Sequence, residues 1–361
     1  MKKKKILLWG YIGRKNFGDD LLFEIALKNL EHLENKEIFV LLPKEIEANY
    51  LSKINSELNI IKYNKSIAIF EFLKYHKVYY IGGGVFFDYK KNIGLVNFFK
   101  RRFSNFLRFN ISRYFGTEFA GVGLGIGPYY SKKTKSISAN ILKNFSLIGV
   151  RDAESLKYAK EFRLKNVFLA NDLSLLLHKD LLKLKKTAIK IDNKILICPR
   201  TYPHKKDFEK HLDILKELTV YLQKKLYNVE WIFLQEENEL LIKELEGLKI
   251  KTRVWNPDEM KLSDFMSHFA SASLVFTSRM HAVYISNMLK TKTVAIDVHP
   301  KLVHSSKLFY RNPIIVNPLS ELKIYKEAMR SDNQYDNEEF IKDYKKVDEV
   351  NFKIIKWLNV K

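Results

Sequence analysis

The feature that most constrains the fold is an alternation of short apolar runs with stretches of helical periodicity. KKILLW, EIFVLL, KVYYIGGG and EFAGVGLG are rich in β-branched and aromatic residues, and amphipathic stretches such as DLLFEIALKNL separate them. This pattern is typical of βα units in a parallel sheet. It resumes with KILIC and continues through VEWIFLQ, TRVW, SLVFTS and KTVAID. The sequence therefore predicts an α/β protein with two Rossmann-like, doubly wound domains.

The boundary between these domains is predicted in the lysine-rich stretch at residues 179–194, where strand character is lost. We place the domains at residues 1–185 and 190–330, and we expect them to face one another across a cleft. A length of 361 residues suits two cores. Residues 335–361 carry apolar side chains at helical spacing, which predicts closing C-terminal helices.

Composition narrows the partners and the compartment. The chain has 63 Lys and Arg against 41 Asp and Glu, and a net charge of +22 favours an anionic partner. A nucleic-acid module would explain the charge but not the glycine-rich motifs described below, so we expect no nucleic acid. The single cysteine, Cys198, permits no internal disulfide, and no apolar run is long enough to span a membrane. We expect a cytoplasmic protein.

The first motif, WGYIGRKNFGDDLL, lies where the first predicted strand hands over to a helix. Asn16 and Gly18 precede Asp19 and Asp20 in the first helical turn. Free amides at such a helix start can hold an anion or a polar sugar, although Asp19 would equally serve as a simple helix cap. The GxGxxG spacing of dinucleotide sites is absent, which disfavours a hydride-transfer enzyme.

Two further strand ends carry polar groups. Three successive glycines, Gly82, Gly83 and Gly84, end a predicted strand and are followed by Asp88. The strand LIGV ends in Arg151, which can fork onto a phosphate or carboxylate or can pair with Asp152 as a structural bridge. The carboxyl ends of parallel strands are where open sheets bind ligands.

The fourth motif, SLVFTSRMHAVYISNM, places Arg279 and His281 at the first turn of a predicted helix. A helix N-terminus already favours anions, so two added basic groups indicate a phosphate. Lys301 follows the next strand in a predicted loop. Nearby histidines lack the spacing of zinc motifs, and we expect no metal site.

In this order and spacing, the four segments resemble the polysaccharide pyruvyl transferase family. Its motifs look like GYxGxxNxGDD, a four-glycine turn, GxGxGPxxS followed by VRDxxS, and SxRxHA, and the resemblance covers residues 5–310. Here the glycine run is shortened to IGGG, and the lysine-bearing loop at DVHPKL matches loosely. The resemblance implies two lobes similar to the GT-B glycosyltransferase architecture, phosphoenolpyruvate as co-substrate without a further cofactor, and a saccharide acceptor.

On this resemblance we assign roles to the motif residues. The donor-binding residues would be Arg151, Arg279, His281 and Lys301, mainly from the second domain. The catalytic residues would be His281 as an acid, with Asp19 or Asp20 as a base. The acceptor-binding residues would be Asn16, Gly18, Asp19, Asp20, Gly82, Gly83, Gly84, Asp88 and Asp172. The alternative is a glycosyltransferase that uses a nucleotide sugar, in which SRMH would hold the diphosphate.

The segment at residues 97–115, NFFKRRFSNFLRFNISRYF, predicts a basic amphipathic helix. Its apolar stripe comprises Phe99, Phe103, Phe106, Leu107, Ile111 and Tyr114, and Arg101, Arg102, Arg108 and Arg113 flank it. Such helices often lie on anionic membranes, which would place the enzyme at the inner face of the cytoplasmic membrane beside a lipid-linked acceptor. The alternative is a core-facing helix with a solvated edge.

Overall fold

The computed structural model describes residues 3–64, 67–88, 94–200, 205–332 and 335–360. The chain forms two compact units, each with its own parallel sheet. The first unit comprises Met1–Arg14, Asp19–Leu173 and Tyr344–Lys361, and the second comprises Lys15–Gly18 and Ser174–Asp343. Four residues near the N-terminus thus belong to the second unit, and the C-terminal residues return to the first.

The sheet of the first unit has seven strands in the order β3-β2-β1-β4-β5-β6-β7. Their bounds are β1 Lys4–Trp9, β2 Lys36–Pro43, β3 Leu58–Tyr63, β4 Lys77–Phe86, β5 Glu118–Ile126, β6 Phe145–Val150 and β7 Val167–Leu169. All neighbouring strands run parallel. Nearly all of β5 is buried, as expected for a central strand that has helices on both faces.

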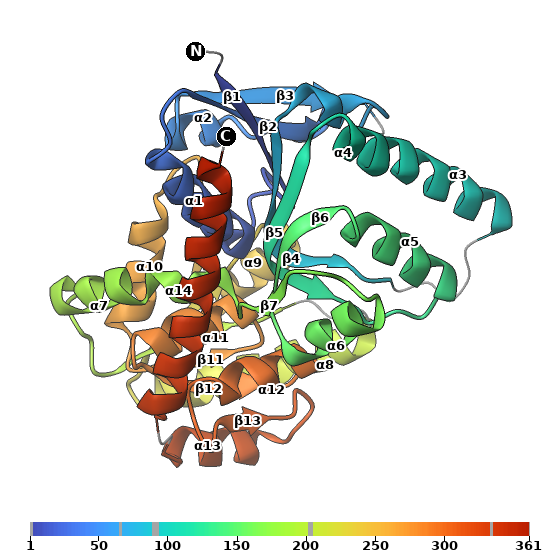
Figure 1. Cartoon of the computed structure of the whole chain (residues 1–361). Helices are drawn as coiled ribbons and strands as arrows, with labels where there is room; N and C mark the ends of the chain where they lie inside the picture. The colour runs from blue at the N-terminus through green and yellow to red at the C-terminus, as the bar shows by residue number, and fades with distance from the viewer. Residues whose placement is uncertain (1–2, 65–66, 89–93, 201–204, 333–334, 361) are drawn as a thin grey trace. The chain divides into compact units, whose positions relative to one another are not determined.

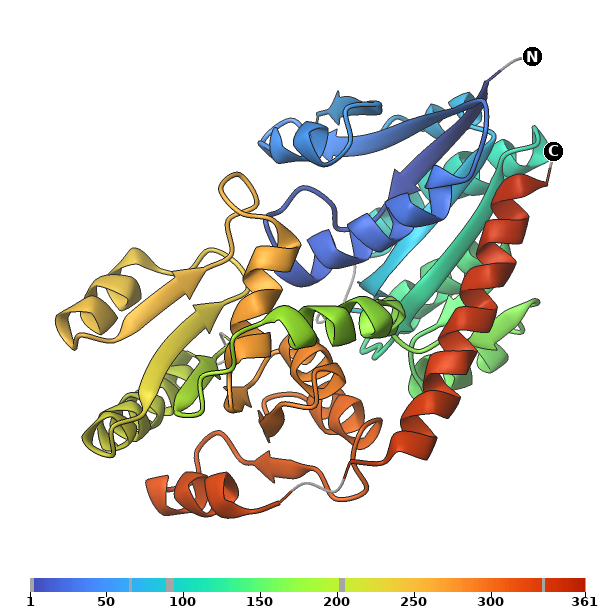
Figure 2. The ribbon, with the colours of Figure 1, turned by 90° about the vertical axis from the view of Figure 1, so that its left-hand side faces the viewer.

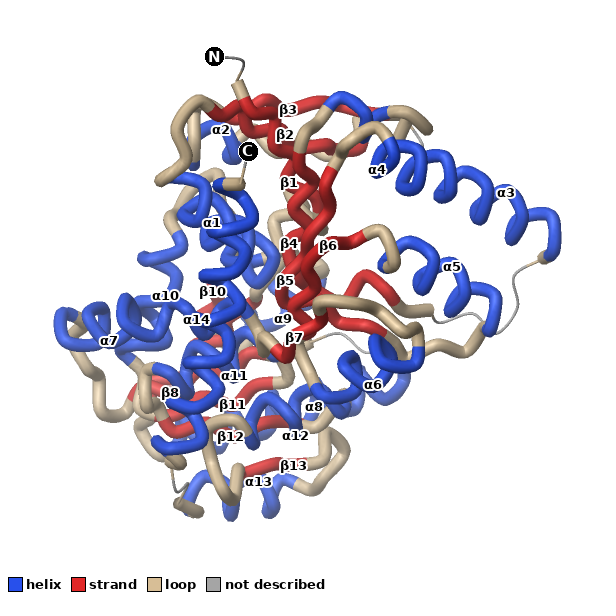
Figure 3. Tube along the Cα trace, in the orientation of Figure 1, coloured by secondary structure: helices blue, strands red, loops and turns tan. Residues whose placement is uncertain are grey.

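Helices cover both faces of this sheet, as Figures 1 and 3 show. Helix α1 and the last turns of α14 lie on one side, where the side chains of Asn29 and Asn351 exchange hydrogen bonds. Helices α3, α5 and α6 lie on the other side. The helical segments are α1 Phe17–Glu31, α2 Tyr50–Ile54, the 3₁₀ turn η1 Glu71–Lys74, α3 Leu95–Asn105, the π-helical turn η2 Phe106–Ile111, α4 Ser112–Tyr114, α5 Lys132–Leu142 and α6 Ala153–Glu161.

The sheet of the second unit has six parallel strands in the order β10-β9-β8-β11-β12-β13. Their bounds are β8 Lys194–Cys198, β9 Asn228–Phe233, β10 Lys251–Val254, β11 Leu274–Thr277, β12 Lys292–Ile296 and β13 Ile314–Val316. The helical segments are η3 Leu173–Leu177, α7 His178–Thr187, α8 Lys205–Lys224, α9 Glu239–Gly247, α10 Leu262–Ser271, α11 Met280–Met288, α12 Pro300–Lys307 and α13 Leu322–Arg330. Central strand β8 is buried throughout.

The predicted fold class is confirmed, because each unit is a parallel, doubly wound sheet with flanking helices. The strands predicted from the apolar runs coincide with β1, β2, β4, β5, β6, β8, β9, β10, β11 and β12. The structure adds β3, β7 and β13, which end their sheets. Edge strands bury less surface, so their sequences carry a weaker apolar signal: every residue of β3 and β7 is at least partly exposed.

The C-terminal segment forms one long helix, α14 (Asn337–Asn359), which is red in Figure 2. We expected more than one helix here. The segment contains neither glycine nor proline, so nothing in the sequence interrupts a continuous helix. No helix in the described part of the chain is both long enough and apolar enough to cross a bilayer.

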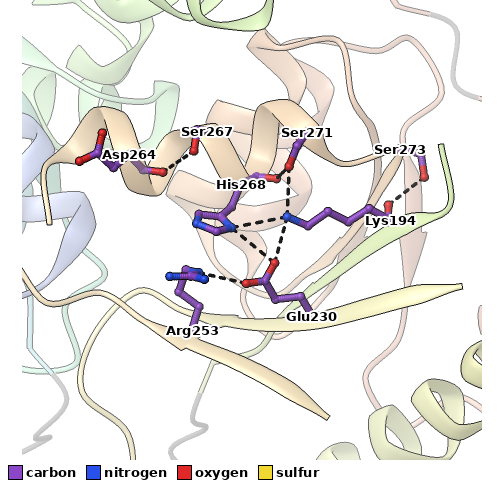
Figure 4. A network of polar contacts seen from close by, with 8 residues as sticks. All are labelled: Lys194, Glu230, Arg253, Asp264, Ser267, His268, Ser271 and Ser273. Carbon is purple, nitrogen blue, oxygen red and sulfur yellow. Dashed lines mark hydrogen bonds and ion pairs between the residues drawn. The ribbon is translucent and has the colours of Figure 1, made fainter. Parts of the chain in front are cut away.

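A buried ion network lies near the starts of the strands in the second unit (Figure 4). The Glu230 carboxylate of β9 lies 2.9 Å from Lys194 Nζ of β8 and 3.0 Å from Arg253 Nε of β10. His268 Nδ1 of α10 lies 3.4 Å from the same carboxylate. One carboxylate thereby ties three strands and a helix together.

The point where strand order reverses is the same in both sheets. In the first unit β1 lies between β2 and β4, and in the second β8 lies between β9 and β11. Ligands of open α/β sheets bind outside the carboxyl ends of the strands at such a point. Gly10, just after β1, permits a close approach to β4, because a Cβ there would lie 3.0 Å from the Ile81 carbonyl oxygen.

Candidate functional site

Arg279 lies at the reversal point of the second sheet, between β11 and α11. Its guanidinium donates from Nε to the Pro199 carbonyl at 3.3 Å and from Nη1 to Gln235 Oε1 at 3.4 Å. Its Nη2 pairs with Glu237 Oε1 at 3.2 Å. A guanidinium has five N–H donors, and within the described part of the chain three of them are used, so two remain for a ligand.

Burial and neighbouring charged groups shape the environment of Arg279. Burial lowers the pKa of Arg279, and the nearby Arg200 adds to this, while Glu237 opposes both effects. Burial also raises the pKa of Glu237. Ser278, directly before Arg279, is fully buried, and its hydroxyl has no hydrogen-bond partner among the described residues. An arginine stays charged in proteins, so this turn presents a cation and a spare hydroxyl to a ligand.

The segment Lys15–Gly18 packs into the second unit beside Arg279. Lys15 forms an ion pair of 2.6 Å with Asp258, and Asn16 Nδ2 donates to Gln235 Oε1 at 2.9 Å. Gln235 Oε1 therefore accepts from both Asn16 and Arg279. The Phe17 ring is fully buried against Trp255 and Phe265. The chain before α1 is thus anchored by ionic, polar and aromatic contacts.

His281 lies in the first turn of α11 and packs against Gly18. A Cβ on Gly18 would lie 1.9 Å from His281 Nδ1, so only glycine leaves room for the imidazole in this position. His281 is half-buried. The structure therefore brings Asn16, Gly18, Arg279 and His281 together in the second unit.

Asp19 lies in the first unit, in the first turn of α1. Burial is the largest of the effects that raise the pKa of Asp19 to about 7; the carboxylates of Asp20 and Asp172 also raise it, and Arg14 and Arg151 partly oppose the shift. A carboxyl with this pKa exists in both protonation states near neutrality. It can therefore either accept or donate a proton under ordinary conditions.

Arg151 follows β6 and is almost fully buried. Its Nε lies 3.5 Å from Asp152 Oδ2, a long contact, while Asp152 caps α6 by accepting from Ser155 N at 2.7 Å. Arg151 Nη2 is buried and has no hydrogen-bond partner among the described residues. The guanidinium packs on Gly125, where a Cβ would lie 2.7 Å from Nη2. Both alternatives for Arg151 thus find support, since it contacts Asp152 and keeps a donor for a ligand.

The other acidic candidates in the first unit lie in different settings. Asp20 is 1% exposed and accepts a hydrogen bond from the Tyr50 hydroxyl. Asp88 accepts from the backbone N–H groups of Tyr130 and Ser131 at 2.8 and 3.2 Å, so it fixes the loop after β5. Asp172 is buried close enough to Asp19 to affect its pKa. Asp19 is therefore the acid in this group best suited to proton transfer.

The glycine run lies at the end of β4. Gly82 could not carry a side chain, because a Cβ would lie 2.9 Å from the Gly123 carbonyl oxygen. Gly83 has a φ of +107°, and its nearest neighbour for an added Cβ is Asp19 Oδ1 at 3.8 Å. Gly84 pairs with Gly125 of β5. The run therefore leaves space for backbone and ligand beside Asp19.

The donor and acceptor sets drawn from the sequence each contain residues of both units. Asn16 and Gly18, expected with the acceptor, lie with Arg279 and His281 in the second unit. Arg151, expected with the donor, lies with Asp19 in the first. Lys301 lies in the first turn of α12 rather than in a loop, since Pro300 favours a helix start, and its side chain is outside the described part.

Several site residues were missed by the sequence reasoning. Gln235 and Glu237 follow β9, Arg200 follows β8, and Ser278 follows β11. The polar run QEEN, directly after the apolar run VEWIFL, was the sequence feature that could have indicated Gln235 and Glu237. Among the described residues, no three His, Cys, Asp or Glu side chains are grouped as they would be around a metal ion.

Comparison with solved structures identifies the architecture. UDP-GlcNAc 2-epimerase from Methanocaldococcus jannaschii matches with a TM-score of 0.61 and 12% identity, covering 99% of both chains. A co-structure of S. aureus MnaA with UDP matches with a TM-score of 0.59 and 9% identity, covering 99% of this chain and 96% of that chain. Arabidopsis thaliana UGT89C1 complexed with UDP gives 0.56 and 9%, covering 99% and 100%. These likenesses show a GT-B-like fold of two Rossmann-like domains.

Sequence comparison identifies a family but no individual curated relative. No curated protein matches the chain significantly. A family profile described as polysaccharide pyruvyl transferase matches residues 16–300, which is most of the chain.

Proposed function

Because the chain belongs to the polysaccharide pyruvyl transferase family, we propose that it transfers pyruvate from phosphoenolpyruvate to a sugar of a lipid-linked precursor of a cell-surface polysaccharide. The product is a pyruvate ketal, and phosphate is released. The matched residues 16–300 include two clusters of candidate residues. One surrounds Arg279 and His281 in the second unit, and the other surrounds Asp19 and Arg151 in the first. The proposed place of reaction is the cytoplasmic face of the membrane, where such a precursor and phosphoenolpyruvate would both be available.

The proposed reaction needs careful control of protons and negative charge. A proton adds to the methylene carbon of phosphoenolpyruvate, and one sugar hydroxyl attacks the central carbon and loses its proton. Phosphate then leaves, and a second hydroxyl attacks the same carbon and loses a proton. The ketal and phosphate are the only products, so no oxidant, reductant or further cofactor is required.

The second unit supplies groups suited to the anionic donor. The two remaining N–H donors of Arg279 and the Ser278 hydroxyl lie at the start of α11, whose N-terminus favours a phosphate. Arg200 adds a further cation nearby. His281, held against Gly18, is the proposed proton donor to the methylene carbon or to the departing phosphate. Lys301 remains a proposed donor ligand.

The first unit supplies the proposed base. With a pKa of about 7, Asp19 can take the proton from an attacking hydroxyl at neutral pH. Arg151 Nη2 offers a spare donor to a carboxylate or a sugar oxygen. Asp172, Asp88 and the glycine run are proposed to shape the acceptor side. The raised pKa of Asp19 beside a buried arginine that retains a donor is the observation that best supports acid–base transfer here.

The direct test measures phosphate released from phosphoenolpyruvate with a panel of soluble glycosides and lipid-linked saccharides. We expect release only when an acceptor is present, together with a new ketal carbon signal in the product. Arg279→Ala and His281→Ala should each lower kcat/KM by about 10²-fold or more. Consumption of a nucleotide sugar without phosphate release would instead identify the glycosyltransferase alternative.

Gly18→Ala sharpens this test without touching the chemistry of any side chain. Its Cβ would lie 1.9 Å from His281 Nδ1, so the imidazole must move. A displacement of about 1 Å can cost about 10²-fold in rate. Gly247→Ala is the matched control, because nothing lies within 4 Å of a Cβ there. Equal activity of the two variants would remove His281 from the proposed mechanism.

A further inference from the structure

Helix α3 turns its large apolar side chains toward solvent. Phe99 and Phe103 are 62% and 65% exposed, and Leu95 and Phe106 extend the same face at helical spacing. None of the residues of α3 is buried. An amphipathic helix of a globular protein normally directs its apolar stripe to the core, so this helix has the opposite orientation.

A second segment with exposed apolar side chains lies beside η2. In and just before η1, Ile69, Phe70 and Leu73 are exposed, with Phe70 at 56%. This segment packs against η2, where Arg108 Nη2 donates to the Ile67 carbonyl at 2.7 Å. We define the aromatic–basic surface as α3, η2, α4 and residues 67–74. Both α3 and residues 67–74 thus expose apolar side chains, and both contact η2.

All charged residues of α3 are basic. Residues 95–115 contain no aspartate or glutamate. Lys100, Arg101 and Arg102 are exposed; by helical spacing Lys100 and Arg102 flank the aromatic stripe and Arg101 lies on the opposite side of α3. Arg108 differs from these, because its side chain is partly buried and bonded to Ile67. Arg113 donates to the Lys143 carbonyl at the end of α5. Within the described ranges Lys100, Arg101 and Arg102 form no ion pair, so their charges can act on an external partner.

A polar groove lies next to the aromatic stripe. Its volume is about 210 Å³, and its lining includes Arg102, Lys143, Asn110 and Asn140. Phe106 forms part of the same wall. With Asn105, which also lines the groove, two cations and three amides match the hydrogen-bonding needs of a phosphate-bearing headgroup.

We propose that the aromatic–basic surface docks the protein on an anionic lipid bilayer, with the Phe99–Phe103–Phe106 face in the interfacial region, Lys100 and Arg102 on headgroup phosphates, and Arg101 adding to the long-range attraction. Aromatic side chains partition to this interface, and cations beside them are attracted to anionic lipid. This inference concerns a surface outside the two clusters of the proposed pyruvyl transfer and does not depend on that reaction.

Charge argues for lipid over a second copy of the chain. A symmetric pairing through this face would place the same cations of α3 near one another, which costs free energy. A bilayer with anionic headgroups supplies the opposite charge along the whole helix. The outward aromatic face and the one-sided charge thus point to the same occupant.

The test is co-sedimentation of the full chain with vesicles of pure phosphatidylcholine and of phosphatidylcholine mixed with phosphatidylglycerol. We expect binding only to the anionic vesicles, and weaker binding at high salt. Changing Lys100, Arg101 and Arg102 together to Gln should weaken binding about 100-fold, since each cation contributes about fivefold. Phe99→Ser with Phe103→Ser should weaken it at least about tenfold.

Two control variants match these changes elsewhere. Lys179→Gln, Lys183→Gln and Lys186→Gln remove the same charge from exposed positions of α7. Phe352→Ser removes an aromatic side chain that is 67% exposed on α14. Both controls should bind vesicles like the unaltered protein. All variants should give the circular dichroism spectrum and the urea unfolding midpoint of the unaltered protein, which shows that they are folded.

Several results would overturn the proposal. One is equal binding of the α3 variants and the unaltered protein, and another is an equal loss in the α7 control, which would indicate net charge alone. A dimer in sedimentation velocity that dissociates on Phe99→Ser and Phe103→Ser, without vesicle binding, would make the surface a subunit interface. Each of these outcomes leaves phosphate release by the unaltered protein intact, so it is distinguishable from a failure of the proposed reaction.

Discussion

Asp19 of the first unit and Glu230 of the second are carboxylates whose pKa values are shifted in opposite directions. Burial, together with the neighbouring Asp20 and Asp172, raises the pKa of Asp19 to about 7. Burial also tends to raise the pKa of Glu230, but hydrogen bonds from His268 and Lys194 hold it well below its usual range. The difference lies in the neighbours, since Glu230 has three basic partners within 3.4 Å.

This comparison separates two uses of a buried charge. Glu230 connects β8, β9, β10 and α10, and its charge is fully compensated. Asp19 lies beside a glycine run and a buried arginine with a spare donor, in a position where proton exchange costs little. We interpret Glu230 as a stabilising group and Asp19 as a reactive one. The following experiments test that distinction.

The largest effect is expected for activity in Asp19→Asn. This change keeps the size of the side chain and removes its exchangeable proton, so phosphate release should fall about 10²-fold to 10⁴-fold. The free energy of unfolding should stay equal or rise, because the substitution replaces a partly buried carboxyl that lies near two other acids with a neutral amide. Glu24→Gln, on the same helix, is the control and should keep near-normal activity. Similar losses in both variants would contradict the assignment.

Glu230→Gln should show the reverse behaviour. Removing one partner of a buried ionic network leaves Lys194 and Arg253 without compensation, and the free energy of unfolding should fall by about 3–5 kcal/mol. Urea unfolding followed by circular dichroism measures this, and activity per folded molecule should not change. In the control, Glu244→Gln, an exposed pair with Lys216 is lost, at a cost of about 1 kcal/mol or less. A similar small loss at Glu230 would show that the network is dispensable.

The charges around Asp19 predict two shifts of opposite sign. Arg151 lowers the pKa of Asp19 and Asp172 raises it. Arg151→Gln should therefore move the pH at which kcat is half-maximal upward, and Asp172→Asn should move it downward, both at saturating phosphoenolpyruvate. Glu154→Gln, an exposed change on α6, should leave the profile in place. Shifts in the same direction would mean that another group controls the profile.

The smallest effect is expected in the pH dependence of stability. The pKa of Glu230 is lower in the folded state, so its stabilising contribution is complete above about pH 4.5 and is lost as the pH falls. The pKa of Asp19 is raised from 3.8 to about 7, so its contribution falls as the pH rises through this range. Urea unfolding at pH 4 and pH 7 measures both effects. The difference in free energy of unfolding between Glu230→Gln and the unaltered protein should be smaller at pH 4 than at pH 7. Asp19→Asn should be more stable relative to the unaltered protein at pH 7 than at pH 4.

The sequence by itself determined the fold class and the candidate strand ends. Apolar runs separated by helical periodicity can be buried only as βα units, and glycine and charged residues at the ends of those runs must meet at one edge of a parallel sheet. This is why Asp19, Arg151, Arg279 and His281 could be named before their surroundings were known. The outward face of α3 was also visible as a stripe, but the sequence could not tell whether that stripe faced the core.

Tertiary structure decided which of these residues lie together and in what state. The segment Lys15–Gly18 joins the second unit through contacts with Gln235, Trp255 and Asp258, residues more than 200 positions away. Asp19 and Glu230 are both acids in an apolar context, and only their spatial neighbours give them opposite pKa shifts. Electrostatic effects act through space over a few ångströms, so sequence patterns fix where a charge is placed and the packed structure fixes what it does.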